Sequence, residues 1–263
     1  MKTFEFEYRE LIKRVCTGVV REGRNGKTVS VIGEQIKFDD LIYNHFPIIT
    51  GRKMFIKGIV GEMAAFLKGP KNVQDFEKEG CNYWSLWANE DGTLDVDYGN
   101  KWRDFNGKDQ IAALIDSLKT NPYGRRHIIQ SWDPAGLDDL SLPCCHYCYQ
   151  FYVDNNNRLH LIWIQRSVDV MVGLPSDAVL AALLLLLVCR SVDMQPGTIT
   201  MQLGDTHIYD KHIESVPQYL SSKELMPPRY FLHPDANINN FEATMLEVIG
   251  YEFDKTIKFE VIA

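Results

Sequence analysis

Two adjacent cysteines, Cys144 and Cys145, stand directly before a β-rich run in the segment LPCCHYCYQFYV, residues 142–153. A cysteine at the junction of a loop and a strand can be exposed on one side and held rigidly on the other, as a nucleophile requires. The competing interpretation is a buried thiol, because free cysteine is among the most buried residue types. Reactivity needs a lowered thiol pKa, which positively charged neighbours provide. No metal site is expected, since no second pair of zinc ligands follows at matching spacing.

Three arginines at the ends of predicted strands can supply that positive charge. Arg125 and Arg126 follow a Pro-Tyr-Gly turn and precede a strand, and Arg166 lies just beyond a strand that contains Gln165. Arginine forks bind phosphate through two parallel hydrogen bonds. Taken singly, each is more often a surface ion pair or a solvated charge, but three in one fold indicate an anion-binding site.

The residue patterns also predict the elements that must position these side chains. Apolar spacing predicts helices over 55–68, 108–119 and 178–189. Alternating or β-branched stretches predict strands over 28–38, 127–132, 149–153, 159–165 and 198–203. The first strand can also be a hairpin that turns at Gly33, and Pro175-Ser176-Asp177 reads as the N-terminal cap of the last helix. Strands mixed with helices, some joined by short turns, indicate an α+β protein with helices packed on a mixed sheet.

The chain has 263 residues, of which 45% are hydrophobic and 24% are charged, as in ordinary globular proteins. No internal repeat or linker-like tract interrupts it, so a single domain over 1–263 is the simplest organisation. The net charge of −7 argues against sequence-independent nucleic-acid binding. The N-terminus, MKTFEFEYRE, carries acids where a signal peptide needs an apolar stretch, and no run reaches the roughly 18 apolar residues of a membrane span. We therefore expect a cytoplasmic protein with no membrane or nucleic-acid partner.

Three segments resemble the thymidylate synthase family in their order and spacing. They are LPCCHYCYQFYV, QRSVDVMVGLPSD (165–177) and GDTHIYDKH (204–212), and supporting matches run from about Thr28 to Ala263. Three ungapped motifs in register are far more specific than one short motif. The resemblance implies the thymidylate synthase fold and an obligate homodimer with shared active sites. It also implies one-carbon transfer from 5,10-methylenetetrahydrofolate to a pyrimidine nucleoside monophosphate, without a metal.

The resemblance assigns nucleotide-binding roles to individual positions. Cys145 matches the nucleophile of the family, whereas Cys144 stands where the family usually has proline. The implied substrate-binding residues are Arg24, Arg125, Arg126, Arg166, Ser167, Asp177, His207 and Tyr209. Arg125 and Arg126 match a contribution from the partner subunit, and His207 with Tyr209 matches the pair that hydrogen-bonds the sugar 3′-hydroxyl. Arg21 is an alternative to Arg24 as the phosphate arginine of the N-terminal loop, and we favour Arg24.

Other positions match the catalytic and folate side of the family. Glu62 matches the carboxylate that organises water and proton transfers; without the resemblance it would be read as an exposed helix charge. Tyr98 matches the proton-relay region. The folate-side positions are Trp84, Trp87, Asp169, Gly173 and Ala263. Aromatic residues at such spacing otherwise belong to a core. The ending IKFEVIA resembles the C-terminal tail that closes over the folate in this family.

Asp177 departs from the family members that act on uracil, which carry asparagine there. Uracil presents an N3–H donor and an O4 acceptor, which one carboxamide satisfies, whereas cytosine presents the opposite pattern. An ionised carboxylate can accept from N4 and from a protonated N3 in a charge-assisted pair. The phage deoxycytidylate hydroxymethylases of this family resemble the chain in having aspartate at this position. The alternative is that Asp177 merely caps its helix, although Ser176 could cap equally well.

These observations lead to one main hypothesis about the reaction. Cys145 adds to C6 of a cytosine nucleotide, dCMP or CMP, and C5 then takes the one-carbon unit to give 5-hydroxymethyl-dCMP. Hydride from the folate would give 5-methyl-dCMP instead, and the retained tail with Trp84 favours that outcome by excluding water. We favour hydroxymethylation because the cytidylate branch of the family is mainly hydroxymethylating. The sequence is also compatible with a dUMP-using thymidylate synthase and with an idle nucleotide- or RNA-binding homologue.

Overall fold

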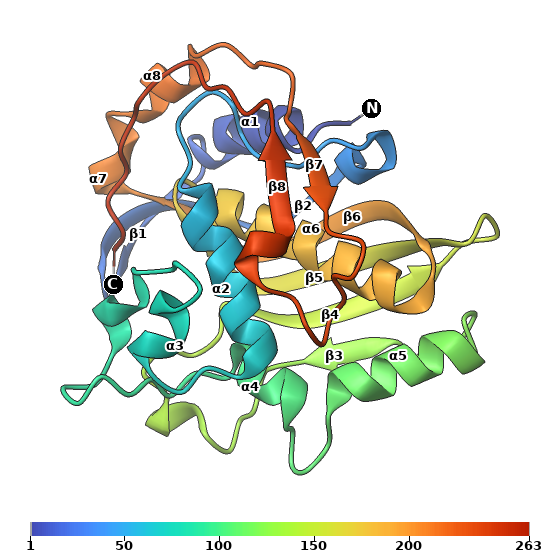
Figure 1. The fold of residues 1–263 in the computed structure, drawn as a ribbon. Helices are drawn as coiled ribbons and strands as arrows, with labels where there is room; N and C mark the ends of the chain where they lie inside the picture. Colours follow the sequence, from blue (N-terminus) through green and yellow to red (C-terminus); the bar gives the residue numbers. More distant parts are fainter. Residues whose placement is uncertain (1, 263) are drawn as a thin grey trace.

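The computed structural model describes residues 2–262 (Figure 1). Its α-helices are α1 (Phe4–Val15), α2 (Ile56–Lys68), α3 (Val73–Glu77), α4 (Tyr98–Arg103), α5 (Gln110–Thr120), α6 (Gly173–Val192), α7 (Asp210–Ile213) and α8 (Val216–Leu220). Its strands are β1 (Val19–Gly23), β2 (Gly26–Phe38), β3 (Ile128–Gln130), β4 (His146–Val153), β5 (Arg158–Asp169), β6 (Gln195–Tyr209), β7 (Arg229–Leu232) and β8 (Leu246–Ile249).

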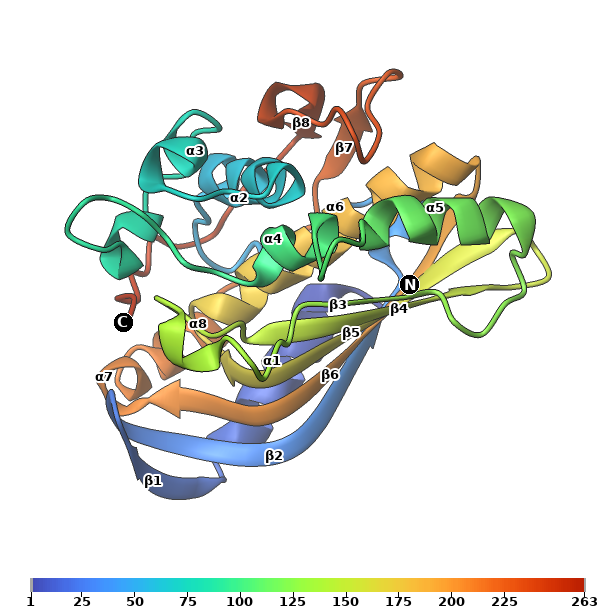
Figure 2. The ribbon, with the colours of Figure 1, turned by 90° about the horizontal axis from the view of Figure 1, so that it is seen from below.

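The main sheet has six strands in the order β1-β2-β6-β5-β4-β3, and β7 pairs with β8 in a separate sheet. Neighbouring strands of the main sheet are antiparallel except β5 and β6, which are parallel. Figure 2 shows the helices gathered on one side of this curved sheet. The α+β fold with a mixed sheet and packed helices is therefore confirmed.

Helix α6 is the apolar core helix that the sequence predicted. By length and composition it could cross a membrane, but 78% of its most apolar window is buried inside the protein. It packs on β5 and β6 and also contacts α2 and α5. Its start was predicted wrongly, because the helix begins at Gly173 rather than at Ala178. The Gly-Leu-Pro run is helical here, since proline is tolerated in the first turn of a helix.

Most other predicted elements are present with shifted bounds. The helix over 55–68 is α2, which ends at Gly69 in the left-handed conformation (φ 67°). The segment 28–38 lies within the single strand β2, and the hairpin turns at Arg24-Asn25 instead of at Gly33. Strands β4, β5 and β6 extend beyond the predicted ranges, and β3 is shorter than predicted. As a result Arg166 lies inside β5 rather than beyond its end.

Helix α1 was not predicted, although Thr3 caps its N-terminus, acids stand in its first turn and bases in its last. Distant contacts hold it in place. The buried Glu5 carboxylate accepts hydrogen bonds from the backbone N–H groups of Thr50 and Gly51 and from the Tyr219 hydroxyl. Arg9 forms an ion pair with the same carboxylate at 2.8 Å. A buried charge is stable when it is paired and hydrogen-bonded in this way. The helix therefore fixes the loop that leads into α2.

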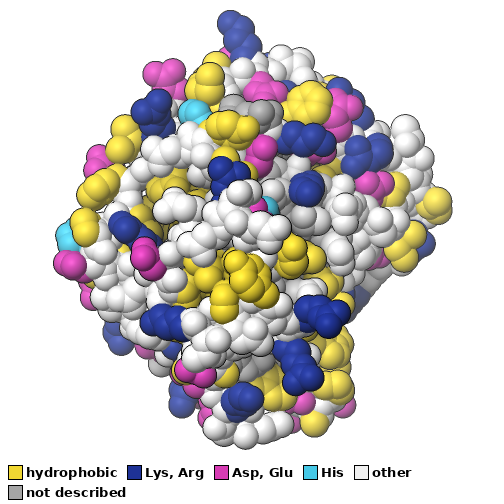
Figure 3. Space-filling view, turned by 90° about the vertical axis from the view of Figure 1, so that its right-hand side faces the viewer, with side chains coloured by type: hydrophobic (Ala, Val, Ile, Leu, Met, Phe, Trp, Pro, Cys, Tyr) yellow, Lys and Arg dark blue, Asp and Glu magenta, His cyan; other side chains and the backbone are white. Residues whose placement is uncertain are grey.

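The surface carries charges of both signs. On the face shown in Figure 3, Lys and Arg side chains alternate with Asp and Glu, and apolar side chains are exposed near its centre. The side of the main sheet opposite the helices exposes apolar side chains among polar ones. Ile128 is 45% exposed and Tyr152 61% exposed, while Ile162 and Ile164 are half-buried.

Candidate active site

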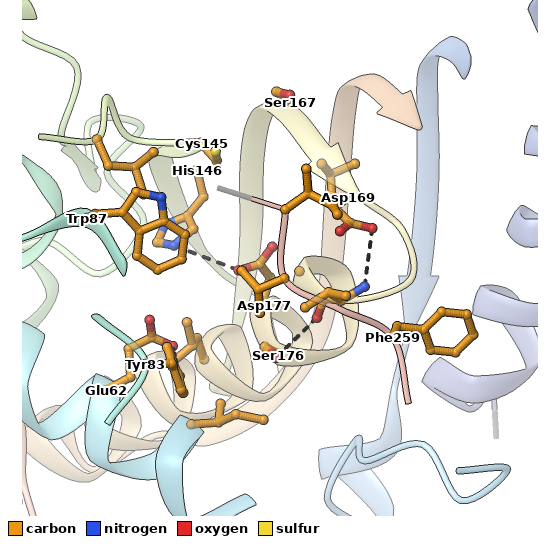
Figure 4. Close-up of a pocket in the computed structure, with 18 of the residues that line it drawn as sticks. Glu62, Tyr83, Trp87, Cys145, His146, Ser167, Asp169, Ser176, Asp177 and Phe259 are labelled. Carbon is orange, nitrogen blue, oxygen red and sulfur yellow. Dashed lines mark hydrogen bonds and ion pairs between the residues drawn. The ribbon is translucent and has the colours of Figure 1, made fainter. Parts of the chain in front are cut away.

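A cavity of about 540 Å³ lies between α2, the start of α6, the ends of β5 and β6, and the C-terminal tail (Figure 4). It brings together most residues that the sequence singled out. The predicted residues that line it are Arg24, Glu62, Trp84, Trp87, Tyr98, Cys145, Arg166, Ser167, Asp169, Gly173, Asp177, His207 and Tyr209. Ligand sites of this kind are concave and mostly apolar, with a few convergent polar groups.

Three predicted residues lie apart from this group, and a fourth is not among the described residues. Arg125 and Arg126 are exposed on the turn before β3 and do not line the cavity of their own chain. The Arg21 guanidinium lies 3.8 Å from the Asp205 carboxylate, outside the cavity that Arg24 lines. Ala263 lies outside the described residues. Of the two candidate loop arginines, the structure thus places Arg24 at the cavity.

Cys145 immediately precedes β4, at the predicted junction of loop and strand. Its backbone N–H donates to the Tyr98 hydroxyl at 2.9 Å, and its carbonyl accepts from the Arg166 backbone N–H at 2.9 Å. Burial raises the pKa of the Cys145 thiol, and the charge of Arg166 partly offsets this effect. Burial raises the pKa of the neighbouring Cys144 thiol to about 12. Cys144 is thus fully buried and protonated, and Cys145 alone of the two faces the cavity.

Arg166 is held against the loop before Cys145. Its Nε and Nη2 donate to the Cys144 and Pro143 carbonyls, each at 2.9 Å, and its guanidinium lies 5.4 Å from the centre of the Trp132 ring. A guanidinium has five N–H donors, so these two bonds leave donors free for an anion. The same contacts fix the arginine beside the Cys145 thiol.

Glu62 projects from α2 and is 7% exposed, so the reading of it as an exposed helix charge is wrong. The Tyr83 hydroxyl and the Trp84 indole N–H each donate to its carboxylate at 2.7 Å. Burial raises the pKa of Glu62 to about 7, while the two donors act in the opposite direction. A carboxyl group whose pKa lies near neutrality can both take up and release a proton. Tyr83 was missed in the sequence, although it directly precedes Trp84.

Asp177 lies beyond the first turn of α6, whose N-cap residue is Val172, so the interpretation as a helix cap is wrong. Its carboxyl group instead faces the cavity (Figure 4). The Gln165 side-chain amide donates to Oδ2 at 2.7 Å. Burial raises the pKa of Asp177 to about 8, and the Gln165 bond partly counteracts that shift. The Asp177 carboxyl group is therefore neutral at pH 7.

His146 is 4% exposed and lies among aromatic rings, with centroid distances of 4.5 Å to Tyr98 and 4.4 Å to Trp163. Its Nε2 atom is 3.9 Å from Asp177 Oδ1, and its Nδ1 atom is 2.6 Å from the Tyr149 hydroxyl. Burial lowers the pKa of His146 to about 3. The imidazole is thus neutral throughout the physiological range.

The opposite wall of the cavity combines β6 with the C-terminal tail. His207 and Tyr209 lie on β6 with their ring centres 5.0 Å apart, and His207 Nδ1 is 3.2 Å from Asp205. Asp169 accepts backbone N–H bonds from Met171 and Val172, and burial raises its pKa. Phe259 of the tail lies over the Arg52 guanidinium at 5.3 Å, and both line the cavity. The sequence carried no distinctive signal for Arg52.

A comparison with protein families agrees with this geometry. The family model described as thymidylate synthase matches residues 6–263, nearly the whole chain. Members of this family are cytoplasmic, typically dimeric one-carbon transferases that use methylenetetrahydrofolate and a pyrimidine nucleotide. On this match, which spans the cavity and every element around it, the chain belongs to the thymidylate synthase family.

Proposed function

We propose that the protein transfers a one-carbon unit from 5,10-methylenetetrahydrofolate to C5 of dCMP, giving 5-hydroxymethyl-dCMP. The observation that carries the choice of cytosine is the Asp177 carboxyl group, which faces the cavity and does not cap α6. Its hydrogen-bond partner is the side-chain amide of Gln165 on strand β5. A partly buried carboxyl group that faces the cavity, at the position where uracil-using relatives have asparagine, is a candidate for base recognition.

The raised pKa of Asp177 changes how that recognition works. A neutral carboxyl group donates from its O–H and accepts at its other oxygen, which complements the N3 acceptor and the N4 donor of cytosine. The pair shares one proton, which can sit on the carboxyl group or on N3. When a thiolate adds to C6 and negative charge moves onto the ring, a proton at N3 stabilises that charge. A neutral Asp177 thus supplies this proton itself. An ionised Asp177 would instead require cytosine to bind already protonated at N3.

The remaining residues have separate tasks in this proposal. The Cys145 sulfur forms the bond to C6, which makes C5 nucleophilic. Arg166 and Arg24 hold the phosphate, and the positive charge of Arg166 also favours the thiolate beside it. His207 and Tyr209 hold the sugar. Glu62, with a pKa near 7, moves protons between ordered water and the base.

The folate supplies the carbon at the oxidation level of formaldehyde, and the cavity fits such a co-substrate. Asp169, which is partly buried, offers a carboxylate to a ring N–H, and the half-buried Trp87 offers an aromatic face elsewhere on the cavity wall. The start of α6 at Gly173 brings backbone close to the cavity with no side chain in between. These residues would hold the pterin, and the tail would cover it.

A second outcome, methylation to 5-methyl-dCMP, is favoured by one observation. Phe259, Val261 and Ile262 of the tail all line the cavity, so the wall on that side is apolar. A site that excludes water favours hydride delivery over hydration. We retain hydroxymethylation as the main proposal because of the aspartate that the chain shares with the hydroxymethylating branch.

The deciding experiment incubates the protein with methylenetetrahydrofolate and either dCMP or dUMP, with product mass and dihydrofolate release as readouts. We expect a product about 30 mass units heavier than dCMP, the added CH₂O, with no dihydrofolate formed. Asp177→Asn should reverse the preference and favour dUMP, because a carboxamide complements uracil. Cys145→Ala is the control and should form no product. Faster turnover of dUMP by the unaltered protein would refute the proposal.

Three wider features belong to the same proposal. The chain acts as one catalytic unit over its whole length, in the cytoplasm. Two copies form a homodimer in which Arg125 and Arg126 reach the phosphate site of the partner, which accounts for their exposure outside the cavity of their own chain. Neither membrane nor nucleic acid is a partner, and no metal takes part.

A further inference from the structure

The His146 imidazole is placed beside the carboxyl group that would read the base. Its Nε2 atom lies 3.9 Å from Asp177 Oδ1, too far for a direct hydrogen bond. A single donor group with two hydrogens can reach both atoms at about 2.9 Å, the usual N–H···O distance. Which tautomer the ring adopts therefore decides what kind of group fits between them.

Two contacts of the Tyr149 hydroxyl favour one tautomer of the ring. The Tyr149 hydroxyl contacts both the His146 carbonyl, at 3.0 Å, and His146 Nδ1, at 2.6 Å. A carbonyl oxygen can only accept, and a phenol has one proton to give. With that proton on the carbonyl, the Nδ1 atom must carry the hydrogen of the shorter bond. Nε2 is then left as an unprotonated acceptor that faces Asp177.

The strand geometry explains why the carbonyl needs this proton. The pairing of β4 with β5 shifts register between His146 and Cys148. Buried carbonyl groups are almost always hydrogen-bonded, and side chains replace the ladder where pairing is irregular. Tyr149 is fully buried next to this irregularity, and its hydroxyl supplies the donor.

The neutral carboxyl group of Asp177 cannot select the base alone. It pairs with cytosine as described above, but it can also donate to uracil O4 and accept from N3–H, because a carboxylic acid is both donor and acceptor. An additional acceptor next to the exocyclic position removes this ambiguity. The amino group of cytosine has a second hydrogen for it, whereas uracil O4 would face its lone pair.

We propose that His146 is a second specificity-determining residue, whose unprotonated Nε2 accepts the outer N4 hydrogen of cytosine while Asp177 Oδ1 accepts the inner one. This inference rests on the proposed function for its substrate, but the tautomer can be tested without it. Gln165 contributes by donating to Oδ2, which keeps Oδ1 turned toward His146. Tyr149 acts as a positioning residue, since its hydroxyl bonds to His146 and the residue does not line the cavity.

Two measurements test the inference. In the ¹⁵N NMR spectrum of the unaltered protein, His146 should show a protonated Nδ1 and an unprotonated Nε2 at pH 7. In Tyr149→Phe the ring is free to carry its proton on Nε2, and the kcat/KM preference for dCMP over dUMP should fall by about ten-fold, the equivalent of ~1.4 kcal/mol. Tyr147→Phe, a half-buried neighbour outside the cavity, is the matched control and should keep the preference within about two-fold.

The possible failures can be told apart. A protonated Nε2 in the unaltered protein would overturn the inference, whether or not the variant folds. An unchanged preference in a folded Tyr149→Phe would overturn it as well, while leaving the cytidylate function intact. If the unaltered protein turned over dUMP faster, the proposed function would fail, and with it the role of His146 in selecting cytosine, even with the expected tautomer.

Discussion

At the scale of single residues, burial decides the protonation of the site. Glu62 and Asp177 have pKa values raised to about 7 and about 8, and His146 has its pKa lowered to about 3. Each shift arises because surroundings of low polarity disfavour the charged form of the side chain. At pH 7 the Asp177 carboxyl group and the His146 imidazole are therefore neutral, and in our proposal the choice of base depends on the positions of their hydrogens rather than on their charge.

This protonation has a consequence for stability. The folded protein binds the Asp177 proton more tightly than the unfolded chain, in which the pKa is close to 3.8. The contribution of Asp177 to the free energy of unfolding therefore falls as pH rises between about 4 and 8, by about 1.4 kcal/mol for each pH unit. The Asp177→Asn variant has no proton to lose at this position. Its free energy of unfolding should therefore increase, relative to that of the unaltered protein, from pH 5 to pH 9.

Urea unfolding at several pH values measures that difference. Glu62 is present in both proteins, and its charge adds to the raised pKa of Asp177. The exposed Asp138→Asn controls for the loss of one negative charge. A stability difference between Asp177→Asn and the unaltered protein that does not vary with pH would show that the pKa of Asp177 is not raised in the folded protein.

At the scale of elements, the close approach of α4 to α2 positions Tyr98. A Cβ atom on Gly99 would overlap the Phe66 carbonyl oxygen of α2. The Phe66 and Tyr98 rings stack beside this contact with centroids 5.1 Å apart, and the Tyr98 hydroxyl accepts from the Cys145 backbone. The absence of a side chain at Gly99 thus allows the packing that carries Tyr98 to the nucleophile.

Gly99→Ala should force the two helices apart. Overpacking of this kind costs about 1–3 kcal/mol, and we expect a lower melting temperature together with a loss of kcat, because Tyr98 moves away from Cys145. Gly136→Ala is the matched control, since a Cβ there meets no atom within 4 Å and φ is −111°. Equal melting temperatures for the two variants would contradict the close approach.

At the scale of the whole molecule, the sheet has helices on one side and a partly apolar opposite side (Figure 2). Arg125 and Arg126 are exposed at the end of the sheet, away from the cavity of their own chain. A homodimer that buries the open side of the sheet would explain both features. In a two-fold dimer each chain can then complete the site of the other.

Subunit mixing tests this arrangement. Cys145→Ser and the double variant Arg125→Ala, Arg126→Ala should each be nearly inactive as homodimers. After refolding together, half of the dimers are mixed, and each mixed dimer has one site free of both changes. Activity should then recover to roughly a quarter of that of the unaltered protein. Activity no higher than the mean of the separate variants would show that the arginines serve their own chain or no site at all.

The sequence by itself determined the elements whose signals are local. The apolar spacing of α2 and of most of α6 lies within one stretch of chain in each case, so the local pattern was sufficient to predict both helices, although not the start of α6. The three family motifs likewise identified key residues of the cavity, among them Cys145, Arg166 and Asp177, because the types and order of those residues are written in the chain.

The tertiary structure alone decided how those residues act. The start of α6, and hence the release of Asp177 from a capping role, follows from the packing of the helix on the sheet. Helix α1 is held by Thr50 and Tyr219, far away in the sequence. The pKa of Asp177 and the tautomer of His146 depend on burial and on partners from other strands, which no local pattern encodes. The sequence specifies the residue types, whereas the folded surroundings determine which of their atoms carry protons.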